Sequence, residues 1–246
     1  MPVPGKTFIA DKNGEGVWSD IPVPRELTLP EIASIVSDYR QAARNAIDAG
    51  MDGVEIHAGN GYLLDQFINS NSNKRQDQYG GSIENRARLV LEVAQAVAQE
   101  VGADRVGVRL TPMGRFMGMG DDTPEATFSQ IVRELNALQL AYLHLVEPAV
   151  VGTVKDENHD PRWDSIMQLL RQEWKGVLMV AGGYDPVTAE QALASGRADM
   201  VAFGRPFIAN PDLPRRIREG LPLNEPDPST FFGGDEHGYI DYPAYD

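Results

Sequence analysis

Strand-like and helix-like patterns alternate along this chain, and the alternation limits the fold more than any other feature of the sequence. Short apolar segments of β character are separated by longer segments in which apolar residues recur every three or four positions. This order is typical of parallel strands joined by helical crossovers. Strands are predicted over residues 52–57, 106–110, 142–146, 177–181 and 200–204.

The predicted helices begin at recognisable capping signals. Thr28 and Glu31 fit a capping box, and the helix that follows them ends at Gly50. Thr123-Pro124 and Asp185-Pro186 each begin a helix with proline in the first turn, where its missing N–H costs no hydrogen bond. Two further helices are predicted over residues 83–100 and 163–174.

Polar or glycine-rich residues follow every predicted strand. Function at the C-terminal ends of several strands is typical of a (β/α)8 barrel, whereas an open doubly wound sheet concentrates it at one switch point. No G-x-G-x-x-G follows the first strand, which weakens the dinucleotide-binding alternative. We therefore predict a barrel. The strand-end segments are residues 57–62, 109–112, 147–148, 182–183 and 204–205.

The segment after the first predicted strand carries an imidazole, an amide and a phenol. His57 and Asn60 are hydrogen-bond donors suited to polarising a carbonyl, and Tyr62 can deliver a proton. Gly59 and Gly61 free the backbone, so that residues three apart can reach one site. A histidine satisfied within the core is the plainer interpretation of His57, but its place at a strand end favours function.

Two glycine-containing strand ends predict an anion site. Barrels commonly bind phosphate in the loops after strands seven and eight, through backbone N–H groups. Gly182, Gly183 and Gly204 would let the backbone approach an anion, and Arg205 could grip it with two hydrogen bonds. Tight turns alone also explain such glycines, but their occurrence on consecutive strands favours phosphate. The strand ending at His57 would then be the fourth.

Three further segments have competing interpretations. Arg109 is either a salt-bridged barrel residue or a ligand contact, and a cation at the end of a strand favours the contact. His144 lies inside a strand between leucines, which favours a structural role. Loop 112–122 is rich in glycine and methionine and is a candidate lid.

The composition excludes several classes of protein. The 22 basic and 36 acidic residues leave a net charge of −14, which argues against a nucleic-acid partner. The chain has no cysteine, so disulfides and Cys-ligated metals are excluded. A metal-dependent hydrolase needs clustered histidines, and no H-x-H occurs, so no metal is predicted. No segment has the ~20 apolar residues of a membrane span, and no signal-peptide pattern is present, so we expect a cytoplasmic protein without a membrane partner.

Seven motifs together form a specific pattern over nearly the whole chain: residues 52–57, 60–67, 73–75, 79–86, 109–112, 181–184 and 203–213. This pattern resembles the old yellow enzyme family of FMN-dependent ene-reductases, over about the C-terminal two-thirds of such a protein. The resemblance implies a TIM (β/α)8-type barrel of which this chain contains about five βα units, strands four to eight. Within a single partial domain, 1–246, it implies a hairpin or loop excursion at 1–28, βα units at 29–220 and a tail at 221–246.

The resemblance also implies residue roles in the NADPH- or NADH-dependent reduction of an α,β-unsaturated carbonyl compound. His57 and Asn60 would bind the carbonyl oxygen, and Tyr62 would protonate the α-carbon. Arg109 would lie against the pyrimidine edge of the flavin and favour its anionic reduced form. The FMN phosphate would be held by Gly182, Gly183, Gly204 and Arg205.

Two departures from the family pattern affect the predicted function. Family members often have tyrosine at the position of Phe232, a candidate substrate-binding residue, so a hydroxyl is lost here. The chain also lacks the segment that would supply strands one to three. We therefore predict an ene-reductase acting on a small enone, with one alternative, a truncated and non-catalytic fragment. The partner expected besides substrate is a second copy of the chain or a complementing N-terminal fragment.

Overall fold

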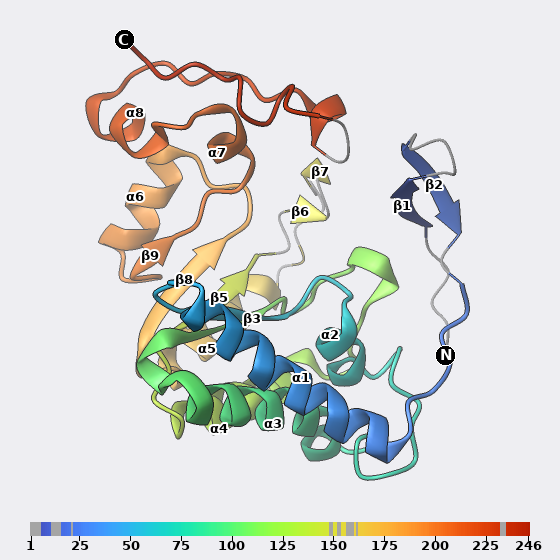
Figure 1. The fold of residues 1–246 in the computed structure, drawn as a ribbon. Helices are drawn as coiled ribbons and strands as arrows, with labels where there is room; N and C mark the ends of the chain where they lie inside the picture. The colour runs from blue at the N-terminus through green and yellow to red at the C-terminus, as the bar shows by residue number, and fades with distance from the viewer. Residues whose placement is uncertain are drawn as a thin grey trace.

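The centre of the molecule is a five-stranded parallel sheet whose strands lie in the order β3-β4-β5-β8-β9 (Figure 1). The structure is a computed structural model that describes residues 6–10, 16–20, 22–147, 150–151, 154–155, 160, 162–231 and 235–246. The sheet strands follow one another in space as they do in sequence, which is the arrangement of a barrel wall. Their bounds are β3 Val54–Ala58, β4 Val106–Leu110, β5 Tyr142–Val146, β8 Val177–Ala181 and β9 Met200–Val201.

The predicted strands agree with this sheet except at its two edges. The bounds predicted for β4, β5 and β8 are confirmed. Strand β3 is shifted, to Val54–Ala58 in place of 52–57, and β9 is only two residues long. The strand predicted over 200–204 is confirmed for its first two residues only. Among the described residues β9 pairs with β8, and the chain then turns into helix α7, Arg205–Ala209.

Helices pack side by side along one face of the sheet. Helix α1 contacts α3, α3 contacts α4, and α4 contacts α5 (Figure 1). The predicted capping box at α1 is confirmed, since the Glu31 carboxylate accepts the Thr28 backbone N–H at 2.8 Å. In the structure, the helices that were predicted have the bounds α1 Leu29–Asp48, α3 Ile83–Val101, α4 Pro124–Asn136, α5 Arg162–Glu173 and α6 Pro186–Ala194.

Most of the short elements were not predicted; the exception is the hairpin formed by β1 and β2, which lies within the hairpin or loop excursion expected at 1–28. Helices α2, α7 and α8 have five to seven residues, too few to show a helical period. Two antiparallel hairpins lie outside the central sheet. The short elements are α2 Leu63–Ile68, α8 Leu213–Glu219, hairpin β1 Lys6–Ala10 with β2 Gly16–Asp20, hairpin β6 Val150–Val151 with β7 Val154–Lys155, and the 3-10 turns Ala103–Arg105, Phe116–Gly118 and Pro228–Thr230.

The two faces of the sheet carry different side chains. On the face that packs against the helices, Val108, Leu143 and Leu178 are fully buried. Residues alternating with them point to the opposite, interior face, where Val177 is 39% and Met200 45% exposed. In a doubly wound sheet helices cover both faces, so cover on one face excludes that alternative for the described residues. Within the same ranges, no helix is long and apolar enough to cross a membrane.

Candidate active site

The turn that follows β3 brings the predicted imidazole and phenol together. Asn60 and Gly61 have left-handed backbone conformations, with φ of 55° and 75°. A Cβ at Gly61 would lie 2.7 Å from the Cβ of Met117, so only glycine fits there. The ring centroids of His57 and Tyr62 are consequently 5.3 Å apart, with Asn60 in the turn between them.

Two buried side chains hold this turn in place. The Asn60 N–H donates to Thr111 Oγ1 at 3.0 Å, and the Gly61 N–H donates to Asp65 Oδ2 at 2.8 Å. Asp65 is only 1% exposed, and its burial raises its pKa to about 6, against the opposing effect of hydrogen bonds from Gly61, Asn69 and Thr111. The turn is therefore tied both to α2 and to the segment after β4.

A row of polar side chains crosses the interior face beside this turn. His57, Arg109 and His144 are paired in register on β3, β4 and β5. Each has a buried nitrogen without a hydrogen-bond partner, namely His57 Nδ1, Arg109 Nε and His144 Nε2. Buried polar atoms almost always have partners, so three unpartnered nitrogens at one level fit a site that receives a polar ligand such as the flavin edge.

The charge state of His57 suits a hydrogen-bond donor to a carbonyl. Burial and the positive charge of Arg109 lower the pKa of His57, although Glu55 acts in the opposite direction. The imidazole is thus neutral at pH 7 and carries one N–H. Tyr62, in contrast, is 49% exposed, so a molecule arriving from solvent can reach its hydroxyl.

The predicted phosphate residues lie where β8 and β9 end. Gly182 has a φ of 135°, and a Cβ there would lie 2.8 Å from the Cβ of Glu147. Gly183 and Gly204 are exposed, and a Cβ at Gly204 would meet nothing within 4 Å. Arg205 begins α7. Because β8 and β9 are neighbours, both loops leave the same edge of the sheet, whereas Phe232 lies outside the described residues.

The structure adds residues that sequence reasoning missed. His144 Nδ1 lies 2.9 Å from Glu55 Oε2, so His144 has a partner of its own, as a structural role requires, and also a free nitrogen. Glu55 could have been found, since it precedes His57 by two residues and therefore shares its face of β3. The candidate lid 112–122 is anchored at one end, where Asp121 forms a buried ion pair with Arg86.

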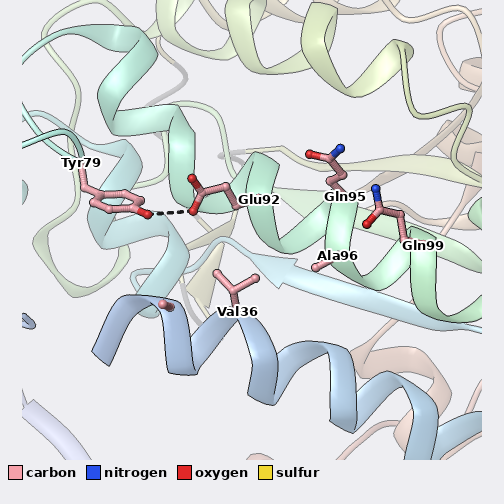
Figure 2. A pocket seen from close by; sticks show the side chains of 7 residues that line it. Val36, Tyr79, Glu92, Gln95, Ala96 and Gln99 are labelled. Atoms are coloured by element: carbon pink, nitrogen blue, oxygen red, sulfur yellow. Dashed lines mark hydrogen bonds between the residues drawn. The ribbon is translucent and has the colours of Figure 1, made fainter. Parts of the chain in front are cut away.

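The outer helices carry a separate groove, which contains none of the predicted site residues. A cavity of about 310 Å³ lies between α1 and α3, and the Tyr79 hydroxyl there donates to Glu92 at 2.9 Å (Figure 2). It lies among the helices rather than at the strand ends. As for metals, no cluster of three or more histidine and carboxylate side chains that could hold an ion occurs among the described residues.

Known proteins resemble this chain in both sequence and fold. 12-Oxophytodienoate reductase 2 of Arabidopsis thaliana is 46% identical over 224 residues, which cover 90% of this chain and 58% of that protein. Solved structures of morphinone reductase (48% identity, TM-score 0.90) and of an old yellow enzyme homologue from Zymomonas mobilis (40%, 0.90) cover 98% and 99% of the chain. The predicted fold, part of a (β/α)8 barrel, is confirmed by this similarity.

The match extends over most of the chain but not over most of its relatives. The chain spans 58% of the length of the Arabidopsis protein, 63% of morphinone reductase and 66% of the Zymomonas homologue. Residues 7–224 match the family described as NADH:flavin oxidoreductase / NADH oxidase. These residues include the turn after β3, Arg109 and both glycine-containing strand ends. The chain belongs to the NADH:flavin oxidoreductase / NADH oxidase family.

Proposed function

We propose that this chain carries the substrate-binding turn and the phosphate loops of an FMN-dependent ene-reductase. The reaction is reduction of the activated C=C bond of an α,β-unsaturated carbonyl compound with NADPH or NADH. The observation that carries the proposal is the 5.3 Å separation of the His57 and Tyr62 rings beside three unpartnered buried nitrogens. A related structure, morphinone reductase, contains tetrahydroNAD, which supports a nicotinamide as the reductant.

The turn after β3 would act on the carbonyl substrate. Neutral His57 and Asn60 each donate a hydrogen bond to the carbonyl oxygen, where negative charge builds as the β-carbon is reduced. Tyr62 holds the proton that is delivered to the α-carbon. FMN, when bound, would supply the hydride. Water is limited on the sheet side of the turn because Thr111 and Asp65 are buried there.

The remaining predicted residues would hold the cofactor. Arg109 presents a cation on the interior face, where it would neutralise negative charge on the pyrimidine ring. The exposed backbone at the ends of β8 and β9 would accommodate the phosphate, with Arg205 as its cation. Phe232 stays a predicted substrate contact. The proposed phosphate residues are Gly182, Gly183, Gly204 and Arg205.

A second candidate is a non-catalytic fragment that needs a complementing N-terminal segment or a second copy of the chain. The exposed interior side chains Val177 and Met200 favour it, since apolar residues of a barrel interior are normally covered. Preference for NADPH over NADH and a cytoplasmic location stay predictions.

Purification of the chain separates the two candidates. The enzyme should be yellow, with flavin absorbance that is retained through gel filtration, and it should oxidise NADPH when cyclohexenone is added. Gel filtration also gives the oligomeric state. A colourless protein that fails to bind added FMN would contradict the enzyme and support the fragment.

Substitution of Tyr62→Phe tests the proton donor. Reduction of bound flavin by NADPH should be unchanged, whereas reduction of the enone should slow by about 10²- to 10⁴-fold, the usual contribution of a positioned acid. Stopped-flow absorbance separates the two half-reactions. Tyr39→Phe, on α1, is the matched control and should change neither. Equal enone rates in Tyr62→Phe and the unmodified protein would remove Tyr62 from the mechanism.

A further inference from the structure

A tyrosine crosses the interior face directly over a glycine. A Cβ at Gly107 would lie 2.3 Å from Cε2 and Cζ of Tyr142, so the absence of a side chain on β4 makes room for the ring. Tyr142 thereby reaches from β5 towards β3, where its hydroxyl interacts with the Glu55 carboxylate. His144, also on β5, places Nδ1 2.9 Å from Glu55 Oε2. Glu55 is thus held by two β5 side chains.

The Glu55 carboxyl is ionised in this setting. Burial alone would raise its pKa, but hydrogen bonds from His144 and Tyr142 and the charge of Arg109 bring the pKa below its ordinary value. Burial and Glu55 raise the pKa of Tyr142 to about 12, so the phenol stays a donor.

The interior face combines this carboxylate with a single fixed cation. Among its described strand residues, the ionisable groups are Glu55, His57, Arg109, Tyr142 and His144; β8 and β9 contribute only apolar side chains there. Among these described strand residues, Glu55 therefore has no second anion beside it to compensate for its loss.

We infer that Glu55 is a positioning residue: clamped by Tyr142 and His144, it supplies the counter-charge that balances Arg109 next to His57. Its loss would leave the guanidinium uncompensated in a partly desolvated interior, where charges interact more strongly than in water. An uncompensated cation disfavours protonation of His57 and favours negative charge on a neighbouring ligand. Only this last consequence, on bound flavin, rests on the proposed function.

The decisive test is the titration of His57 in the full chain without added cofactor. Histidine-selective ¹⁵N labelling gives one signal set for each of the four histidines, and His57→Gln assigns that of His57. Glu55→Gln should lower the proton affinity of His57 by about 3- to 10-fold. Tyr142→Phe keeps the charge and should have a smaller effect.

The outer helices offer a matched control. Glu92 also accepts a tyrosine hydroxyl, but it lies in the groove between α1 and α3 (Figure 2). Glu92→Gln should therefore leave the titration of His57 unchanged. Arg109→Gln should shift it in the opposite direction, and this variant decides the matter if Glu55→Gln does not fold. A His57 titration that is insensitive to either substitution, in a variant with native circular dichroism, would overturn the inference.

A second measurement addresses the flavin. In protein loaded with FMN, Glu55→Gln should shift the midpoint potential of the flavin to more positive values, because an unbalanced Arg109 stabilises the negatively charged reduced form. Glu92→Gln should not. An unchanged potential in Glu55→Gln would contradict the effect on bound flavin. If the chain binds no FMN, the proposed function fails, whereas the His57 titration still decides the role of Glu55.

Discussion

The two faces of the central sheet differ in how completely their side chains are satisfied. On the helix-covered face, Leu143, Leu178 and Val180 are fully buried in one continuous core. On the interior face, buried nitrogens of His57, Arg109 and His144 have no partner. The difference indicates that one face stabilises the fold, while the other has polar groups reserved for a ligand. Substitutions on the two faces should therefore differ in their effects.

The largest loss of stability is expected on β8, where Leu178 and Met179 are neighbours that point to opposite faces of the sheet. Leu178→Ala should lower the free energy of unfolding by about 2–5 kcal/mol, because it leaves a cavity in the packed core. Met179→Ala, on the half-buried interior face, should cost less than about 1 kcal/mol. Urea unfolding followed by circular dichroism measures both. Equal costs would show that the interior face is packed as tightly as the other.

Asp65 should give the site a pH dependence of its own. Its pKa is about 6 when folded, so the folded protein holds a proton that the unfolded chain loses near pH 4. Protonated Asp65 stabilises the folded protein fully below pH 4, and this stabilisation falls as the pH rises from 4 to 6. Above pH 6 the folded protein is less stable by a constant amount, on the order of 3 kcal/mol.

The variant Asp65→Asn isolates this contribution from those of other carboxyl groups. Its stability relative to the unmodified protein should improve by about 3 kcal/mol between pH 4 and pH 7. Urea midpoints across that range provide the measurement. A relative stability that does not vary with pH would mean that Asp65 is ionised throughout.

Gly107 tests whether the interior face is closely packed at one point. Gly107→Ala should destabilise the protein by about 2 kcal/mol, since the added methyl overlaps the Tyr142 ring. Gly204→Ala, where a Cβ meets nothing, is the control and should change stability by less than about 0.5 kcal/mol. Adding Tyr142→Val to Gly107→Ala should remove the overlap. Failure of this rescue would place the strain elsewhere.

The smallest effect should distinguish the two tyrosine–glutamate pairs. Tyr142→Phe should cost about 1–2 kcal/mol, because it removes the hydroxyl that interacts with the Glu55 carboxylate in the interior. Tyr79→Phe, in the outer groove, should cost about 0.5–1 kcal/mol, since water can replace the lost hydroxyl at Glu92. Thermal unfolding at pH 7 compares them. A larger loss for Tyr79→Phe than for Tyr142→Phe would show that the outer groove depends more on its tyrosine hydroxyl than the interior face does.

The fold could be predicted from the sequence because buried parallel strands consist of short apolar runs bounded by glycine or polar residues. The bounds of β4, β5 and β8 could be predicted on that basis. Strand β9 could not, because its length depends on pairing at an edge. Helices α2, α7 and α8 are shorter than the window in which a helical period can be detected.

The candidate site also has one part that could be predicted from local sequence and one part that depends on contacts between strands. The short distance between His57 and Tyr62 follows from a local turn, which Gly59 and Gly61 indicate in the sequence. The contacts of Glu55 with Tyr142 and His144 depend on the register of three strands far apart in the chain. No local pattern encodes that register, so this cluster required the structure.

The crossing of Tyr142 over Gly107 also limits how this sequence can change over evolutionary time. A side chain can be gained at position 107 only after the ring at position 142 has become smaller, because the reverse order passes through a clash. Either position alone would look invariant, although neither need contact a ligand. Among relatives the two positions should therefore change together, with an aromatic residue at one accompanied by glycine at the other.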